Sequence, residues 1–341
     1  MGSTVSAAFA SDNAAPAHPL VMDAVINANQ DAVGSYGSDP YTDRAARALR
    51  TVFDAPDAEV LFALTGTAAN VIALAAAVQP WQQILCSDIA HALLDEAGGP
   101  VRLAGAQLTA LPSDDGLIEP RELDAHIARR GDVHHSQPRI VTVTQSTENG
   151  RIWPPGRLAE FIDYAHRHDL LVHVDGARVA NAIAALGVSA RDAIGDADIV
   201  TVGGTKNGMM FGDAVLVRRP EHFQGIRFLQ KQIGQLASKQ RFVSAQFEAV
   251  LHDDLWLHMA AHANRMAAAL SDGIRSAGAQ LASPTEANEV FATLDAATIA
   301  RIRERFAVHT PDPLTPIARF VCSWATTEQD VSVLLDVIAP G

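Results

Sequence analysis

The 341-residue chain is 48% hydrophobic, which is enough to bury a sizeable core and to divide into two domains. Its net charge of −13 and its pI near 5.4 argue against nucleic acid or an anionic membrane surface as the main partner. No basic segment followed by a long apolar stretch opens the chain, and its longest apolar segments contain Asn, Gln or Pro, so we expect a soluble, cytoplasmic protein with no membrane span.

Short β-like runs alternate with longer helical runs between residues 60 and 220. The pattern predicts strands, several of them running into turns, at 59–66, 83–87, 139–145, 170–178, 197–208 and 213–219. It predicts helices between them at 67–78, 91–97 and 155–169. The run at 139–145 is β-branched and continuous, as in a strand buried on both faces. The alternation therefore indicates an α/β fold with a mostly parallel sheet covered by helices.

The pattern changes after Phe242. A long helix over 244–278 is expected to lead into short elements at 289–294, 305–310 and 318–324. We therefore divide the chain into a large domain over 1–248 and a smaller α+β domain over 249–341. Cys86 and Cys322 both lie in apolar strand-like runs, which favours buried free thiols over a disulfide.

An aspartate and a lysine at the ends of two successive strands give the strongest chemical signal. Asp175 ends the run LLVHVD, and Lys206 follows the run ADIVTVGGT. Pyridoxal phosphate (PLP) needs such a pair, because a lysine amine forms its Schiff base and a carboxylate keeps its pyridine nitrogen protonated so that the ring accepts electrons. Asp175 and Lys206 are the first two residues that we assign to a PLP site.

Two other strand ends fit the same edge of the sheet, where ligands of doubly wound folds collect. Gly66 and Thr67 lie where a strand gives way to a helix N-terminus, whose free N–H groups suit a phosphate, although a plain tight turn would look the same. His91 follows the strand QILCS. Its flat ring would stack on a cofactor, or it is an ordinary helix-start histidine.

Metal chemistry is the alternative from a different class. His173 and Asp175 have the H-x-D spacing that begins a two-histidine-one-carboxylate iron site, but no persuasive third ligand follows. His258 and His262 have the i, i+4 spacing of a zinc helix without the glutamate of H-E-x-x-H. We therefore expect no metal.

Basic residues outside these strands have two interpretations each. Lys231, Lys239 and Arg241 form either a charged helix surface or a basic segment that reaches a phosphate in a neighbouring subunit. Arg319 opens an apolar strand, where a lone guanidinium suits bidentate pairing with the carboxylate of an amino-acid substrate.

Taken in order, these pieces resemble the fold-type I PLP enzymes and, within them, the low-specificity L-threonine aldolases and their relatives that act on phenylserine. The similarity covers nearly the whole chain and is carried by ASDNAAPAHP, YGSDP, TGTAAN, IAHALLDEAGG, TQSTENG, HVDGAR, GGTKNG, QLASKQRF and IARFVCSWATTEQD. The resemblance implies a large domain with a mostly parallel seven-stranded sheet between helices and a smaller C-terminal α+β domain.

Residue roles follow from the resemblance. Lys206 would bind PLP covalently, Asp175 would pair with the pyridine nitrogen, and His91 would stack on the ring. The implied cofactor-binding set is Gly66, Thr67, His91, Asp175, Arg178, Thr205, Lys206, Lys239 and Arg241. The implied substrate-binding set is Ser11, Tyr36, Arg178 and Arg319, and a partner subunit would contribute Tyr36, Lys239 or Arg241. The base for the substrate hydroxyl would be His91 or a water that it holds.

The implied reaction is reversible cleavage of L-threonine, L-allo-threonine or phenylserine-like β-hydroxy-α-amino acids to glycine and an aldehyde, in a homotetramer built from dimers with shared sites. A fold-type I transaminase or β-eliminating lyase would use the same lysine, aspartate and phosphate turn, and a non-catalytic cofactor-binding protein is a further alternative. The chain departs from the family where Cys322, Ser323 and Trp324 replace a Thr-His pair, and where TENG replaces E-N-T-H. Trp324 is expected near the substrate site.

Overall fold

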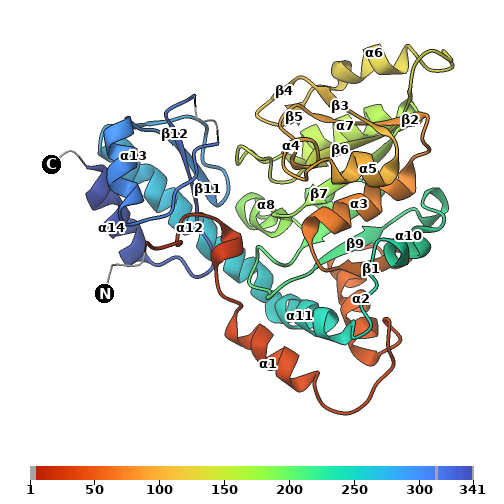
Figure 1. Cartoon of the computed structure of the whole chain (residues 1–341), viewed down its shortest axis with the longest axis horizontal. Coiled ribbons are helices and arrows are strands. Elements are labelled where there is room, and N and C mark those ends of the chain that lie inside the picture. Colours follow the sequence, from red (N-terminus) through yellow and green to blue (C-terminus); the bar gives the residue numbers. More distant parts are fainter. Residues whose placement is uncertain (1–4, 312–313, 340–341) are drawn as a thin grey trace.

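The structure, a computed structural model, describes residues 5–311 and 314–339. Its larger part is built on a seven-stranded sheet with the order β1-β9-β8-β7-β6-β2-β3 (Figure 1). The strands are β1 (Glu59–Ala63), β2 (Gln82–Ser87), β3 (Gln107–Leu111), β6 (Gln137–Thr144), β7 (Leu171–Gly176), β8 (Ile199–Gly203) and β9 (Asp213–Val217). β9 runs antiparallel to both of its neighbours, and the other pairs are parallel. The predicted mostly parallel sheet is confirmed.

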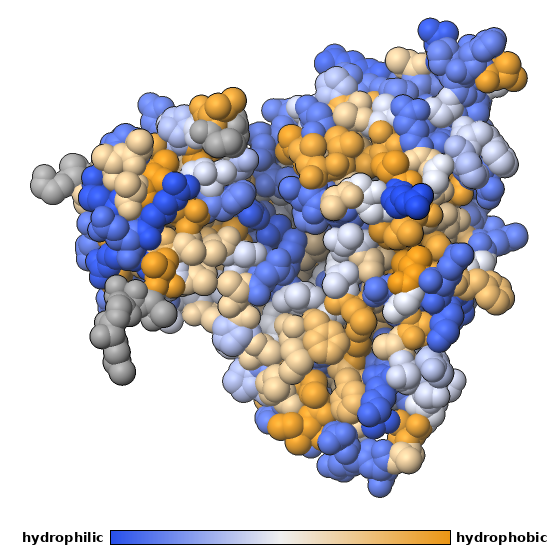
Figure 2. All heavy atoms as spheres, in the orientation of Figure 1, coloured by the Kyte–Doolittle hydropathy of each residue, from blue (hydrophilic) through white to orange (hydrophobic). Residues whose placement is uncertain are grey.

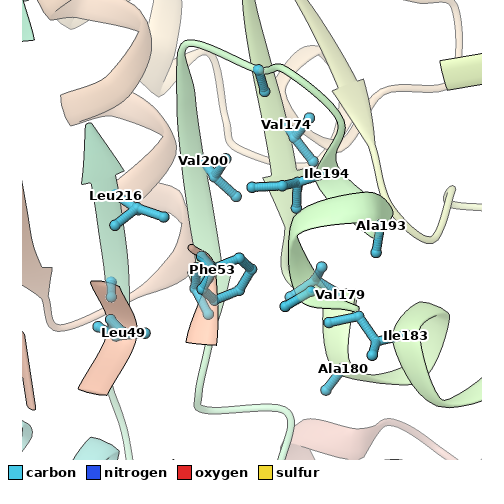
Figure 3. Close-up of a cluster of buried hydrophobic side chains, with 14 of the residues drawn as sticks. Leu49, Phe53, Val174, Val179, Ala180, Ile183, Ala193, Ile194, Val200 and Leu216 are labelled. Carbon is cyan, nitrogen blue, oxygen red and sulfur yellow. The ribbon is translucent and has the colours of Figure 1, made fainter. Parts of the chain in front are cut away.

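Successive residues of the central strands contribute to two different cores, because side chains alternate between the faces of a strand. Ile140, Leu171 and Ile199 pack on one face with helices α3 (Gly66–Ala77) and α10 (Ile226–Gln232). Their neighbours Val141, Val172 and Val200 pack on the other face. That face is covered by α2 (Pro40–Val52), α7 (Pro155–Arg167), α8 (Val179–Leu186), α9 (Ala190–Ile194) and α11 (Arg241–Leu251). Figure 3 shows Val174, Val200 and Leu216 on this second face, with Phe53 and the α8 residues Val179 and Ile183.

The smaller part contains a three-stranded antiparallel sheet, β10-β11-β12. Its elements are α12 (Leu255–Ser276), β10 (Gln280–Leu281), β11 (Glu289–Thr293), α13 (Ala296–Arg303), β12 (Ile317–Val321) and α14 (Glu328–Ile338). The N-terminal segment packs here as well, since Phe9 belongs to this core and its carbonyl accepts a hydrogen bond from the Val321 N–H at 3.0 Å. α12 begins in the core of the larger part with Met259 and ends in the core of the smaller part with Ile274, so it joins the two.

The remaining elements of the larger part are short. They are η1 (Asp12–Ala14), α1 (Pro19–Asn27), α4 (His91–Leu94), α5 (Gly99–Ala104), β4 (Ser113–Asp114), β5 (Leu117–Ile118), η2 (Pro120–Leu123), α6 (Asp124–Ile127) and η3 (Pro220–His222). Figure 2 shows hydrophobic residues gathered on the surface over α1 and over α4 and α5, where Leu20, Ile26, Leu94 and Leu103 are exposed. No helix in the described ranges is long and apolar enough to cross a bilayer.

Three predicted elements differ from the structure. The expected helix over 244–278 is broken into α11 and α12 by η4 (His252–Asp254), because Asp253 and Asp254 adopt positive φ angles of 49° and 54° that a continuous helix does not allow. The helical stretch at 91–97 ends at Leu94, before a positive φ at Ala97. The segment 305–310 forms only isolated bridges in the described chain. The expected buried free thiols, Cys86 and Cys322, are confirmed.

Candidate active site

The predicted residues at the strand ends meet in one cavity. It has a volume of about 490 Å³ and lies at the C-terminal edge of the parallel strands, where β1, β2, β7 and β8 end. Seven of the predicted site residues line it: Gly66, Thr67, His91, Asp175, Arg178, Thr205 and Lys206. Because these residues are up to 140 positions apart, as Gly66 and Lys206 are, the parallel sheet is what assembles the site.

Asp175 is buried at the end of β7 and is held in its ionised form. Its Oδ2 accepts a hydrogen bond from Asn70 Nδ2 at 2.8 Å, and its Oδ1 accepts one from the Ala177 N–H at 3.0 Å. Burial alone would raise the pKa of this carboxyl, but the neighbouring His173, the charge of Lys206 and these bonds hold the pKa below its usual range. A fixed carboxylate in this position suits a protonated pyridine nitrogen.

His91 begins α4 and is tied to a second buried carboxylate. Its Nδ1 lies 2.9 Å from Oε1 of Glu96, whose side chain is fully buried. This hydrogen bond raises the pKa of His91, outweighing the opposing effect of burial. The same Glu96 oxygen accepts a bond from Asn70 Nδ2 at 2.8 Å. A single amide nitrogen thus connects the carboxylates that orient the two predicted ring-binding residues.

Lys206 reaches the cavity from a turn that packs closely on its neighbours. A Cβ atom at Gly203 would lie 2.2 Å from the Ala177 carbonyl oxygen, so only glycine fits there. Burial and the nearby charge of Arg178 lower the pKa of Lys206. A lowered pKa increases the share of neutral amine, which is the nucleophilic form that a Schiff base requires.

The start of α3 lines the same cavity as this lysine and has the geometry of a phosphate-binding helix N-terminus. Thr65 caps the helix through a 3.2 Å hydrogen bond from the Ala68 N–H, and the first N–H groups of a helix have no partner within it. Asp213 stands opposite Gly66, and its Oδ1 accepts the Gly204 N–H at 2.8 Å. Burial raises the pKa of Asp213, which favours its neutral form next to an anion. The donors at the helix N-terminus, the amine, the carboxylate and the flat imidazole are together the set that PLP requires.

Arg178 also lines the cavity but is already paired. Its Nε and one terminal nitrogen donate to the two oxygens of Asp12 at 2.7 and 3.0 Å, and the other terminal nitrogen lies 3.4 Å from Glu289. Burial lowers the pKa of this guanidinium, but the two carboxylates together have the larger effect and raise the pKa above its ordinary value. Arg319 is not among the lining residues, and its Nε donates to the same Glu289 at 2.9 Å. Glu289, in β11 of the smaller part, therefore contacts both Arg319 in β12 and Arg178 in the larger part.

Other predicted residues lie outside this cavity. Ser11 caps η1 by accepting the Asn13 N–H at 3.2 Å, and it borders a separate hollow. Tyr36 is 49% exposed, with Lys231 Nζ 4.4 Å from the centre of its ring. Lys239 and Arg241 do not line the cavity either. Within one protomer, the structure does not bring these residues to the strand ends.

Trp324 is also outside the cavity lining. Its indole N–H donates to the Pro16 carbonyl at 3.0 Å, and its ring lies 4.9 Å from that of His18. The expectation that this ring borders the substrate site is therefore not met within one protomer.

His173 and His262, considered above as iron and zinc ligands, have other partners in the structure. In residues 5–311 and 314–339, no group of three or more His, Cys, Asp or Glu side chains is placed to hold an ion. His173 Nδ1 lies 2.8 Å from the Thr142 hydroxyl, and burial lowers the pKa of this ring to about 4. His262 Nε2 donates to the Thr326 carbonyl at 2.7 Å.

Sequence reasoning missed five polar residues that organise the site: Asp12, Asn70, Glu96, Glu148 and Asp213. Asn70 and Glu96 belong to motifs that had been singled out, TGTAAN and IAHALLDEAGG, but nothing in the spacing shows that they meet. Glu148 lies in TENG, a departure from the family pattern, which was the one available signal.

Comparison with known proteins defines the class. Residues 8–297 match the family described as beta-eliminating lyase. The fold is that of fold-type I PLP enzymes, because the aspartate aminotransferase of Thermus thermophilus matches with a TM-score of 0.72 at 14% identity over 99% of this chain and 92% of that one.

Two further similarities are more specific. The chain is 38% identical to the low specificity L-threonine aldolase of Pseudomonas aeruginosa over 330 residues, which is 96% of this chain and 95% of the relative. The solved threonine aldolase of Leishmania major matches with a TM-score of 0.93 at 29% identity, covering 97% of this chain and 98% of that one. The chain belongs to the L-threonine aldolase family of PLP-dependent lyases.

Proposed function

We propose that this protein uses PLP to cleave L-threonine, L-allo-threonine and related β-hydroxy-α-amino acids such as phenylserine to glycine and an aldehyde, and to join glycine and aldehydes in reverse. The observation that carries the proposal is that Lys206, Asp175 and His91 face one cavity beside the N-terminus of α3. The names of the relatives from Pseudomonas aeruginosa and Leishmania major support the substrate class.

The chain's own residues supply binding and orientation. Lys206 would hold the cofactor and would afterwards deliver or hold a proton at Cα, while Asp175 would keep the proton on the ring nitrogen. When bound, PLP accepts the electron pair of the bond that breaks at Cα. The choice of bond depends on orientation, because only a bond perpendicular to the ring is cleaved.

The substrate carboxylate fixes that orientation, and an arginine is suited to bind it. Arg319 has a partly exposed guanidinium, and among the described residues its acidic partner is Glu289, so an arriving carboxylate can share it. Arg178 is more tightly enclosed by Asp12 and Glu289, which suits a contact with the cofactor's phenolic side. Together the two arginines would orient the substrate so that Cα–Cβ, rather than Cα–H, is the bond that breaks.

The proposed assembly is a homotetramer built from two dimers, with active sites shared between the subunits of a dimer. We propose that it acts in the cytoplasm. Tyr36, Lys239 and Arg241 do not line the cavity of their own protomer. Tyr36 lies beside the residue that precedes Lys239, since the Tyr36 N–H donates to the Ser238 carbonyl at 3.0 Å. The exposed apolar residues Leu20 and Ile26 of α1 lie on the chain just before Tyr36. A second subunit covering α1 would bring these groups to its partner's site.

A product assay separates this function from its alternatives. The purified protein is supplied with PLP and given L-threonine, L-allo-threonine or L-phenylserine, and the products are identified. Release of aldehyde and glycine in equal amounts is expected, and Lys206→Ala should abolish it. Keto acid without ammonia would indicate a transaminase, keto acid together with ammonia would indicate an eliminating lyase, and unchanged turnover by Lys206→Ala would refute the assignment.

A further inference from the structure

Glu148 is a carboxylate in the cavity wall with one oxygen engaged and one without a partner. Its Oε1 accepts hydrogen bonds from the His91 N–H and from the Thr144 hydroxyl, both at 2.8 Å. Its Oε2 is buried and has no hydrogen-bond partner in the described chain. A buried carboxylate oxygen without a partner is costly, and because Glu148 lines the cavity, a donor on a bound ligand can supply the missing hydrogen bond.

We propose that Glu148 is the catalytic base that takes the proton of the substrate's β-hydroxyl through Oε2, and the acid that returns it in the aldol direction. The proposal rests on the proposed function. It assigns a residue that neither the strand-end pattern nor the cofactor requirement predicts. Its Oε1 is held by the backbone N–H of His91, whose ring is expected to stack on the cofactor, and both residues line the same cavity.

The charges around Glu148 suit proton exchange. Burial raises the pKa of Glu148 to about 7, the hydrogen bonds from His91, Thr144 and the backbone of Glu148 itself oppose the rise, and the charge of Asp175 adds to it. Arg178 is also near, but its guanidinium is paired with Asp12 and Glu289, and Cys86, whose pKa burial raises to about 12, is neutral. A group whose pKa is close to the working pH both accepts and releases a proton efficiently.

His91, the alternative base, is the poorer candidate. The hydrogen bond from its ring to Glu96 raises the pKa of His91, so the ion pair favours the protonated imidazolium. An imidazolium donates hydrogen bonds and cannot accept a proton. In this proposal the His91 ring would stack on the cofactor, while the Glu148 carboxylate, which is held by the backbone N–H of His91, would accept the hydroxyl proton.

The proton balance of the step is closed. The hydroxyl proton passes to Glu148 Oε2, the C–O bond becomes C=O, and the Cα–Cβ bond breaks with its electron pair left on the Cα side. Cα then gains one proton, as the hydroxyl lost one. The aldehyde and glycine together contain every atom of the substrate, so no other reactant is needed.

Glu148→Gln tests the proposal, because the amide keeps an oxygen acceptor for His91 and Thr144 but cannot accept a proton. Aldehyde release should fall roughly 100- to 10,000-fold. Exchange of the glycine α-proton with deuterated water needs no hydroxyl base and should stay within about threefold, with the bound cofactor's absorbance retained. The wild-type kcat/KM should rise with pH through about 7, and the variant should lack this rise. Glu119→Gln, at a half-exposed carboxylate paired with Arg157, is the matched control and should behave as wild type.

Thermal melting of the cofactor-free protein gives a readout independent of turnover. The folded-state pKa of Glu148 lies above its ordinary value of 4.5, so ionisation between pH 4.5 and about 7 costs the folded state stability. Glu148→Gln should therefore melt at a higher temperature than wild type at pH 8, with the difference vanishing at pH 4. Should the variant lose the cofactor's absorbance, Glu148→Asp, which keeps the acid, should retain the pH-dependent rise at a lower rate.

Three outcomes would overturn the proposal. They are aldehyde release by Glu148→Gln at the wild-type rate, an equal loss of aldehyde release and glycine exchange, or loss of the pH-dependent rise in Glu148→Asp. A wild-type protein that exchanges glycine protons but releases no aldehyde from any of the three substrates would instead refute the proposed function.

Discussion

Asn70 connects the two halves of the candidate site, and its removal should weaken cofactor binding more than it weakens the fold. Its Nδ2 donates to Asp175 and to Glu96, each at 2.8 Å, and its Oδ1 accepts from the Thr201 hydroxyl at 3.1 Å. Asn70→Ala removes these bonds and leaves two carboxylates facing each other without the shared donor. Both Asp175 and the His91–Glu96 pair should then lose their fixed positions.

The magnitude follows from the bonds to charged groups. Each of the two contributes about 1.5–3 kcal/mol, and with water entering the opened cavity we expect about half of the sum, or roughly 1.5–3 kcal/mol, to be lost. An unfolding entropy of about 2.1 cal/mol/K per residue gives about 0.7 kcal/mol/K for the whole chain, so the melting temperature should fall by about 2–4 °C. Loss of one charged contact at the ring nitrogen corresponds to roughly 10- to 100-fold weaker PLP binding.

The assay compares Asn70→Ala with Asn181→Ala. Asn181 is also a buried helix residue, but its Nδ2 donates to the neutral Asn264 at 3.0 Å and it does not line the cavity. Melting is followed on the cofactor-free proteins at one scan rate, and PLP affinity is measured by absorbance titration. Both variants should melt earlier, and only Asn70→Ala should bind PLP more weakly. Equal PLP affinity in the two variants would refute this role for Asn70.

Three further predictions concern charge and burial. Asp175→Asn removes the charge that holds the ring proton and should slow aldehyde release about 10- to 100-fold or more, measured as kcat. Because the pKa of His91 is raised, its pair with Glu96 stabilises the folded state fully below pH 6.5 and loses this effect as pH rises through the folded-state pKa. The melting temperature of His91→Asn should therefore differ more from that of the wild type at pH 6 than at pH 9. A difference that stays constant with pH would contradict the pairing. Burial raises the pKa of both thiols, that of Cys86 to about 12, so a thiol reagent at pH 8 should modify Cys86 and Cys322 only after unfolding; rapid labelling of the native protein would show that the packing is wrong.

The residues that sequence located well are those that end strands. Asp175, Lys206, His91 and Gly66 each follow an apolar run, and parallel strands bring their C-terminal ends to one edge, so local pattern and a topological rule suffice. The alternation of Val172 and Leu171 between the two cores is likewise set by strand geometry alone.

The residues that sequence did not locate make contacts over long distances along the chain. Asn70 reaches Asp175 across 105 positions, and Arg178 reaches Asp12 across 166. Nothing local distinguishes such an asparagine or aspartate from a solvated one. The break between α11 and α12 was missed for a related reason, since the helical pattern continues through His252 and Asp253 and only the backbone angles reveal the turn.

Locating the lysine that binds the cofactor tests the central claim most directly. The chain has only three lysines, Lys206, Lys231 and Lys239, and borohydride reduction of the PLP-loaded protein makes the covalent bond permanent. Peptide mass spectrometry should then find the cofactor on Lys206 alone, with the absorbance lost in Lys206→Ala. Cofactor on Lys231 or Lys239, or on no lysine, would contradict the assignment of the cavity between Asp175 and the start of α3 as the active site.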